Sequence, residues 1–152
     1  MWSHIPSSHE HEAERQRWLS NTHREEAHHT FPMTVSSHAL LMLVDIEFAF
    51  RTGAWVSVIV LSFSCIEATL RQLKTDDYSS NAFELLGDDK DLDWLRTIRN
   101  EILHSGEPRS VSKLWKLPSS DDIPACQASL EPEAKRAVRL AFRVIYANTK
   151  LK

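Results

Sequence analysis

Glycine is scarce in this chain, which has 3 glycines among 152 residues. Good helix formers are common instead, with many Leu, Ala, Glu and Arg residues, so the composition favours helices. The length suits one domain with a substantial core and is short for two domains. We therefore expect an all-α fold.

Cysteine is also rare, and Cys65 and Cys126 are the two examples. They lie far apart in the sequence and lack the spacing of metal ligands, so a cysteine-based metal site is not expected. Reduced structural thiols in a cytoplasmic protein are the simplest interpretation. The sequence predicts neither a metal nor a cofactor.

A strong net charge and a long apolar run are both absent. The formal net charge is -3, which argues against a protein that coats nucleic acid through bulk charge but allows a local basic site. The uninterrupted apolar stretch 54–66 is shorter than the roughly 20 residues needed to span a bilayer. The polar N-terminus has no signal-peptide pattern, so we expect a soluble protein without a membrane partner.

Residues 1–30 form a polar N-terminal segment, which we expect to be an arm or a weakly docked helix. Seven of the eight histidines precede Ala39, and closely spaced histidines invite a metal interpretation. A solvated helix or arm explains them better, because their spacing matches no familiar site. Ser7 and Glu10 have the spacing of a capping box, so residues 10–27 are expected to be helical.

Residues 31–152 contain four stretches with helical periodicity, which predict an up-down bundle of four main helices. Thr34 is a suitable N-cap for the first helix, and Gly53 is suited to close it. The second helix is apolar on nearly all sides and should be the central one. The predicted ranges are 35–52, 54–74, 92–105 and 132–148.

The connections between these helices have little periodicity. Residues 81–86 are expected to form a short helical turn, and Asp91 or a neighbouring aspartate should cap the helix that follows. Residues 107–131 contain several prolines and are expected to form a long loop with Trp115 and Leu117 as anchors.

Arg99 is anomalous because helical geometry places it in the apolar arc of the 92–105 helix. At about 100° per residue it falls among Leu95, Ile102 and Leu103. A buried guanidinium without a partner is costly, so Arg99 needs a carboxylate, a partner chain or a ligand. Alternatively, the side chain extends its charged end to solvent at the edge of the arc.

Glu67 is a second anomaly, on the apolar stripe of the central helix. It lies one turn after Phe63 and one turn before Leu70, where a lone carboxylate is disfavoured. Glu67 and Arg99 are therefore expected to lie close together. The pair is either a structural ion pair or a site in which the carboxylate orients Arg99 or His104.

The last helix has one basic side, formed by Lys135, Arg136, Arg139 and Arg143. A solvated face is the simpler interpretation of this cluster. A track for the phosphate backbone is the sharper one. In that case Arg139 and Arg143 are candidate substrate-binding residues, together with Arg96 on the 92–105 helix.

The helix order and the run Arg99-Asn100-Glu101-Ile102-Leu103-His104 resemble the HEPN superfamily (higher eukaryote and prokaryote nucleotide-binding domains). That family carries an Arg late in the third long helix of its bundle, often followed by Asn, His or Asp, and then a His after a short spacer. Here four residues separate Arg99 from His104, and Asn100 holds the favoured next position. Residues 64–71 also look like the helix that precedes the motif helix, and the resemblance covers about residues 35–148.

This resemblance implies a homodimer in which the two motif helices face each other and form a composite site. Catalytic members of the family are metal-independent endoribonucleases, so it also implies RNA as the substrate. His104 would act as acid or base, and Arg99 would stabilise the pentacoordinate phosphate. Asn100 would have a positioning role. Glu67 would orient Arg99 and His104 or balance their charge. The implied setting is antiviral defence or a toxin–antitoxin system, with a cognate antitoxin or inhibitor as a further partner.

A non-catalytic role is the main alternative, because many members of this family lack nuclease activity. They act as binding or scaffold modules for a nucleotide or a protein partner, and Arg99 and His104 would then hold a ligand or a dimer seam. A purely structural helical dimer with a buried Arg99–Glu67 pair is the third interpretation. RNA cleavage by the purified protein separates the nuclease from the other two interpretations.

Overall fold

The computed structural model describes residues 9–27, 36–75, 90–103 and 123–147. These residues are almost entirely helical and contain no strand, which confirms the all-α prediction. The described helices are α1 (His9–Ala27), α2 (Ser37–Thr52), α3 (Trp55–Thr75), α5 (Lys90–Leu103), α6 (Ile123–Ser129) and α7 (Glu131–Ala147).

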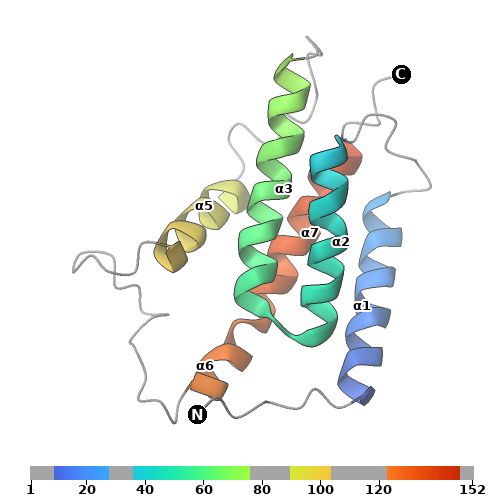
Figure 1. Ribbon diagram of the computed structural model, residues 1–152, viewed down its shortest axis with the longest axis vertical. Helices are drawn as coiled ribbons and strands as arrows, with labels where there is room; N and C mark the ends of the chain where they lie inside the picture. Colours follow the sequence, from blue (N-terminus) through green and yellow to red (C-terminus); the bar gives the residue numbers. More distant parts are fainter. Residues whose placement is uncertain (1–8, 28–35, 76–89, 104–122, 148–152) are drawn as a thin grey trace.

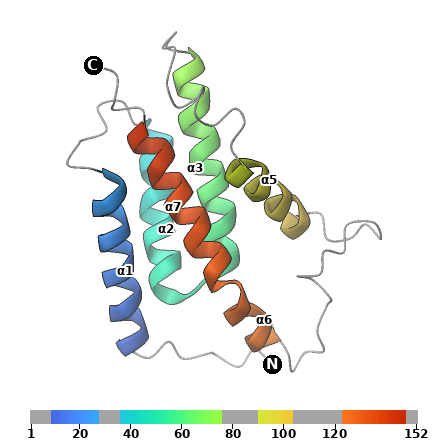
Figure 2. The same ribbon diagram turned by 180° about the vertical axis from the view of Figure 1, so that it is seen from behind.

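The helix α3 is the central element of the bundle, as its apolar sequence predicts (Figure 1). It contacts α2, α5, α6 and α7, while α1 packs against α2 and α7. Seen from behind, α7 runs along α3, and α5 lies tilted on the other side of α3 from α2 (Figure 2). None of the described helices is both long and apolar enough to cross a bilayer.

The two ends of α2 show why this segment folds where it does. Ser36 Oγ accepts a hydrogen bond from the backbone N–H of Ala39 at 3.1 Å, so Ser36, and not the predicted Thr34, is the N-cap. Thr34, Ser36 and Ser37 all carry hydroxyl groups, and Ser36 lies three positions before Ala39, a spacing at which an N-cap side chain reaches the amide. Gly53 closes α2 as predicted, with φ of 76° in the left-handed region.

The helix α1 packs more closely on the bundle than its few apolar residues indicate. Leu19 and Thr22 are buried, and the Trp18 ring stacks on Phe50 with centroids 5.0 Å apart. Arg15 Nη1 donates to the carbonyl of Arg51 at 3.2 Å, close to the C-terminal end of α2. Aromatic and long basic side chains therefore dock α1, which a count of aliphatic positions misses.

The predicted loop 107–131 contains the helix α6 in its described part, which corrects the prediction. A seven-residue helix is too short to show a reliable period. Gln127 Nε2 in α6 donates to the carbonyl of Gly53 at 3.0 Å, which ties α6 to the turn between α2 and α3. The predicted turn 81–86 and the anchors Trp115 and Leu117 lie outside the described residues.

Candidate functional site

Arg99 lies half-buried on the side of α5 that faces α3. Its guanidinium carbon is 4.9 Å from the centroid of the Phe63 ring, and its Nη1 donates to Asn100 Oδ1 at 2.8 Å. A guanidinium over an aromatic face is attracted by the quadrupole of the ring. The structure therefore places Arg99 at the edge of the apolar arc, held by an aromatic ring and a neutral amide.

Glu67 does not pair with Arg99, which corrects the ion pair expected from the sequence. Within the described residues, the carboxylate of Glu67 contacts Arg71 one turn along α3, with Nη2 and Oε1 3.5 Å apart. The Glu67 side chain is 44% exposed, because this edge of α3 faces solvent between α2 and α5. The side of α3 that carries Glu67 is therefore partly open to solvent, where an ionised carboxylate costs little free energy.

A cluster of charges in the first turn of α5 ties this helix to α7. Asp91 accepts hydrogen bonds from Arg136 Nε at 2.9 Å and from Arg143 Nη2 at 3.2 Å. The hydrogen bond from Arg136 lowers the pKa of Asp91, and Arg143 adds to the effect. The Arg136 guanidinium also lies 4.1 Å from the centroid of Trp94. These contacts join α5 to α7, whereas Arg99 contacts Phe63 of α3.

The other arginines predicted to bind substrate are engaged with carboxylates. Arg139 Nη1 contacts Glu25 at 2.9 Å and Glu26 at 3.3 Å, and the hydrogen bond that it donates to Glu25 is the main reason that the pKa of Arg139 is raised. Arg143 contacts Asp91, as described above, and Arg96 lies 3.6 Å from Asp93. A phosphate at these side chains has to compete with acidic groups already in place.

Arg99 differs from these arginines because no carboxylate of the described residues balances its charge. Among the arginines of α5 and α7, all of which lie in described ranges, it is the one without a carboxylate partner. Its charge is therefore balanced by no group in the described part of the chain. An anion is the natural partner for such a fixed guanidinium.

His104 follows Leu103, the last described residue of α5, and lies outside the described residues. The structure thus brings Arg99 and Asn100 together, and the pairing of Arg99 with His104 stays a prediction.

Cys65 is buried and free, and burial raises the pKa of its thiol to about 12, which makes it a poor nucleophile. No group of three or more potential metal ligands occurs among the described residues.

Phe63 is the site residue that the sequence does not reveal. It is buried on α3, where the sequence marks only an apolar position, and its ring supports the Arg99 guanidinium. Sequence periodicity gives the face of each helix but not the rotation of one helix against another. A shared contact between α3 and α5 therefore has no signal in a single sequence.

Comparison of the chain with protein-family models, with curated proteins and with solved structures finds no match.

Proposed function

We propose that this protein is a metal-independent endoribonuclease of the HEPN type. One observation carries the proposal: Arg99 has no carboxylate partner in the described residues, and Phe63 and Asn100 hold its guanidinium in place. A guanidinium that is held but not neutralised keeps its charge for a phosphate. Residues 99–104 resemble the HEPN motif, and this resemblance is our reason for proposing that the phosphate belongs to RNA.

The proposed reaction needs few groups. A base removes the proton of a ribose 2′-OH, the 2′-oxygen attacks the adjacent phosphorus, and the bond to the 5′-oxygen breaks as an acid protonates that oxygen. The products are a 2′,3′-cyclic phosphate and a 5′-hydroxyl. His104 acts as acid or base because imidazole titrates near neutral pH, and Arg99 stabilises the charge of the pentacoordinate phosphate.

The other predicted site residues differ in the role that the proposal gives them. Asn100 is a positioning residue, since its Oδ1 accepts the hydrogen bond from Arg99 Nη1. Arg96 is a candidate contact for a neighbouring phosphate, because its pair with Asp93 is long and more than half exposed and such pairs are weak. Glu67 contacts Arg71 and not Arg99 among the described residues, so its proposed role is limited to charge balance at this edge of α3.

The resemblance extends the proposal to the biological setting. It includes a homodimer in which the second copy completes the surroundings of the site, and a cytoplasmic role in antiviral defence or in a toxin–antitoxin pair. A cognate antitoxin or inhibitor protein would then be a further partner.

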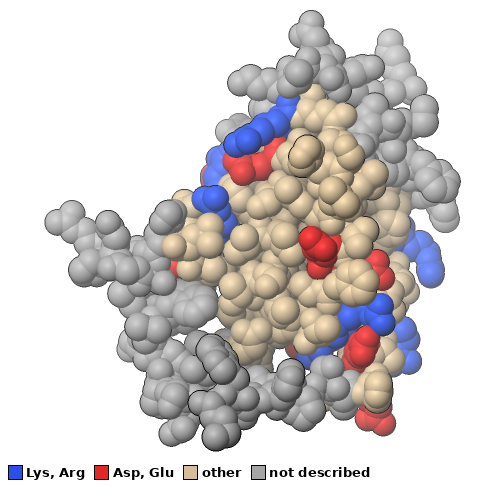
Figure 3. All heavy atoms as spheres, in the orientation of Figure 1, with Lys and Arg blue, Asp and Glu red and all other residues tan. Residues whose placement is uncertain are grey.

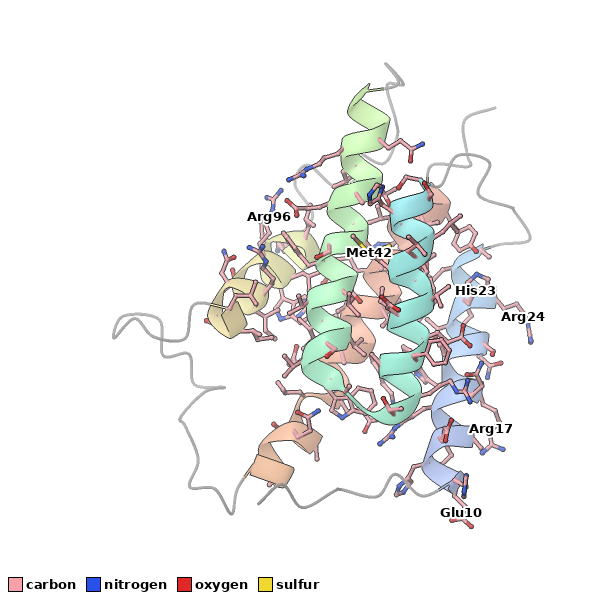
Figure 4. The ribbon with its side chains drawn as sticks, viewed as in Figure 1. Glu10, Arg17, His23, Arg24, Met42 and Arg96 are labelled. Atoms are coloured by element: carbon pink, nitrogen blue, oxygen red, sulfur yellow. The ribbon has the colours of Figure 1, made fainter. Side chains whose placement is uncertain are left out.

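RNA cleavage in EDTA tests the proposal with four proteins: wild type, Arg99→Ala, His104→Ala and Arg17→Ala. The last is a matched control, because Arg17 projects from α1 away from the bundle (Figure 4). We expect wild type and Arg17→Ala to cleave alike, and the other two to lose at least about 100-fold in rate. Equal cleavage by all four would indicate a contaminating nuclease. Absence of cleavage by wild type on varied RNAs would reject the enzyme.

A non-catalytic binding module is the second candidate, and one observation favours it. The solvent side of α2 exposes several large hydrophobic side chains, which is a property of proteins that bind other proteins. A wild-type protein that binds RNA or a nucleotide with an affinity dependent on Arg99, yet cleaves no RNA, would support this candidate over the nuclease.

A further inference from the structure

The solvent side of α2 carries large apolar side chains in one continuous group. Leu40, Leu41, Val44 and Phe48 are 49%, 67%, 51% and 62% exposed, respectively. At about 100° per residue they cover roughly 100° of the helix circumference, opposite the buried residues of the same helix. Scattered exposed hydrophobic residues are ordinary, whereas a continuous group usually marks a binding surface. We call these four residues the α2 stripe.

A carboxylate borders the α2 stripe on each side. The same helical geometry places Glu47 about 20° before Leu40 and Asp45 about 40° beyond Leu41. Both acidic residues are exposed, and neither makes a hydrogen bond or an ion pair among the described residues. In Figure 3 the surface over α2 is mostly uncharged and has an acidic side chain within it. The surface is therefore apolar along its centre and acidic along both borders.

The charged groups on the α1 side of the stripe do not cancel these carboxylates. Arg51 in the last turn of α2 is already paired with Glu12 of α1, with Nη2 and Oε1 2.8 Å apart. His23 of α1 is close enough for the charge of Glu47 to raise its pKa, although burial lowers that pKa by more. The acidic border formed by Glu47 is therefore not neutralised by a fixed cation of α1.

The charged groups on the α3 side do not cancel them either. The exposed carboxylate of Glu67 is 3.5 Å from Arg71, so this pair adds no net charge. The helix α5 packs against α3 and α7, so its charges, including those of Asp93 and Arg96, lie one helix farther from the stripe. His38 is exposed in the first turn of α2, about two turns from Asp45.

We propose that the α2 stripe binds an amphipathic helix of a different protein, with apolar residues along its centre and Lys or Arg along both borders. Packed beside α2, the apolar residues of such a helix cover Leu40, Val44 and Phe48. Its cations lie opposite Glu47 on one border and Asp45 on the other, as charged residues do beside the seam of a coiled coil. The aliphatic stems of Lys and Arg cover further apolar surface.

The charges favour this partner over a lipid surface and over a second copy of the chain. An anionic lipid surface attracts cations beside apolar residues, whereas the borders of the stripe are acidic. The described helices with several basic residues are α1, α5 and α7, and they pack nearly all of their large apolar residues into the bundle. The described part of the chain thus offers no free basic amphipathic helix for α2 of another copy.

This inference goes beyond the proposed function and does not rest on RNA cleavage. The nuclease proposal concerns Arg99 and His104, neither of which lies on α2, so Phe48→Glu should cleave RNA as wild type does. A protein that cleaves no RNA would leave the partner at α2 standing, and a protein without this partner would leave the nuclease standing. The two proposals therefore fail separately.

Selection from a displayed library of helical peptides tests the chemistry of the partner. Every peptide carries the same apolar stripe, and the positions that border the stripe hold Lys, Glu or Ser. On immobilised wild type, we expect peptides with Lys at both borders to be enriched at least about tenfold over peptides with Glu. Equal recovery of the two kinds, or no enrichment of any peptide, would overturn the proposal.

Substitutions test whether the selected peptide binds at the α2 stripe. Fluorescence polarisation should show at least about tenfold weaker binding to Phe48→Glu, because its new charge lies in the apolar contact. Asn21→Glu adds the same charge at an exposed position of α1 and should bind as wild type does. Thermal melting followed by circular dichroism verifies that each variant is folded. A folded Phe48→Glu variant that binds the peptide fully would refute the stripe as the site.

A charge reversal tests the acidic borders. The double variant Asp45→Lys with Glu47→Lys keeps the apolar residues and exchanges the sign of both borders. We expect it to prefer the peptide with Glu at its borders over the peptide with Lys, which reverses the wild-type order. A double variant that keeps the preference for Lys would show that these carboxylates do not select the partner.

Two other results would assign the stripe to a different occupant and overturn the proposal. One is a dimer of the 17.5 kDa chain that Phe48→Glu converts into folded monomers in sedimentation equilibrium, which would identify a second copy. The other is binding to vesicles of anionic lipid that Phe48→Glu abolishes. We expect neither, since a homodimer formed through the motif helices does not involve Phe48.

Discussion

The guanidinium of Arg99 lies over the ring of Phe63, with the guanidinium carbon 4.9 Å from the ring centroid. The contact joins α5 to the central helix α3 and gives a cation a fixed place without neutralising it. The hydrogen bond to Asn100 Oδ1 restricts the guanidinium further. Arg99 therefore has the fixed position that a group needs in order to stabilise a developing negative charge.

The first prediction concerns Phe63. Phe63→Leu keeps an apolar side chain in the core but removes the aromatic face beneath Arg99, so RNA cleavage should fall by about tenfold. The melting temperature should fall by only a few degrees, since the volume lost is small. Phe142→Leu on α7 is a control with the same chemical change away from Arg99. A Phe63→Leu variant with full activity would show that the ring does not position Arg99.

The second prediction concerns Asp91, which joins α5 to Arg136 and Arg143 of α7. Asp91→Asn should lower the free energy of unfolding by about 1 kcal/mol, because the whole cluster loses its anion while remaining partly exposed. Asp93→Asn should have little effect, since its ion pair with Arg96 is long and exposed. Urea denaturation measures both. Equal stability losses in the two variants would contradict a special role for the Asp91 cluster.

The third prediction concerns Gly53, whose φ of 76° is in the left-handed region. A Cβ at this position would also lie 2.9 Å from Arg15 Nη1. Gly53→Ala should therefore cost about 1–2 kcal/mol of stability from the backbone, with a further loss from the displaced arginine. Repeating the substitution in an Arg15→Ala background separates the two parts. If the penalty vanishes in that background, the backbone strain is not the cause.

The fourth prediction is a pH dependence that arises from His23. Its ring packs against Phe142 and Tyr146 and is hydrogen-bonded to the Tyr146 hydroxyl. Burial lowers the pKa of His23, partly offset by the nearby Glu47. Protons therefore bind the unfolded chain more readily than the folded one, and stability should fall as the pH drops through the ordinary histidine pKa of 6.5.

Thermal melts between about pH 7.5 and pH 5.5 measure this effect. Wild type should lose more stability on acidification than His23→Gln, whose side chain does not titrate. The Asp91 cluster does not interfere, because the stability it adds is lost only as the pH falls below the ordinary aspartate pKa of 3.8. Identical pH profiles for wild type and His23→Gln would exclude His23 as the source.

The sequence predicted the helices where period and end signals agree. The ranges of α2, α3 and α7 follow from apolar spacing, with Gly53 as the C-cap of α2. The helix α6 was missed because seven residues carry too little periodicity. The predicted N-cap Thr34 was wrong, since Ser36 has that role and nearby hydroxyl residues look alike in a sequence.

The candidate site was predictable only where it depends on spacing along one helix. The position of Arg99 at the apolar side of its helix follows from spacing alone, and the structure places it there. The pairing with Glu67 was wrong because solvent reaches that edge of α3, which no periodicity can indicate. The partners of Arg139 on α1 and of Arg143 on α5 depend on how whole helices dock, so they could not be foreseen either.

The chemistry of the cleaved ends tests the central claim most directly. Wild-type protein in EDTA is incubated with an RNA and with the same sequence carrying 2′-O-methyl groups, beside Arg99→Ala. We predict fragments with a 2′,3′-cyclic phosphate and a 5′-hydroxyl from the RNA, no cleavage of the methylated strand, and no fragments from Arg99→Ala. Fragments with a 3′-hydroxyl, or cleavage of the methylated strand, would contradict the account.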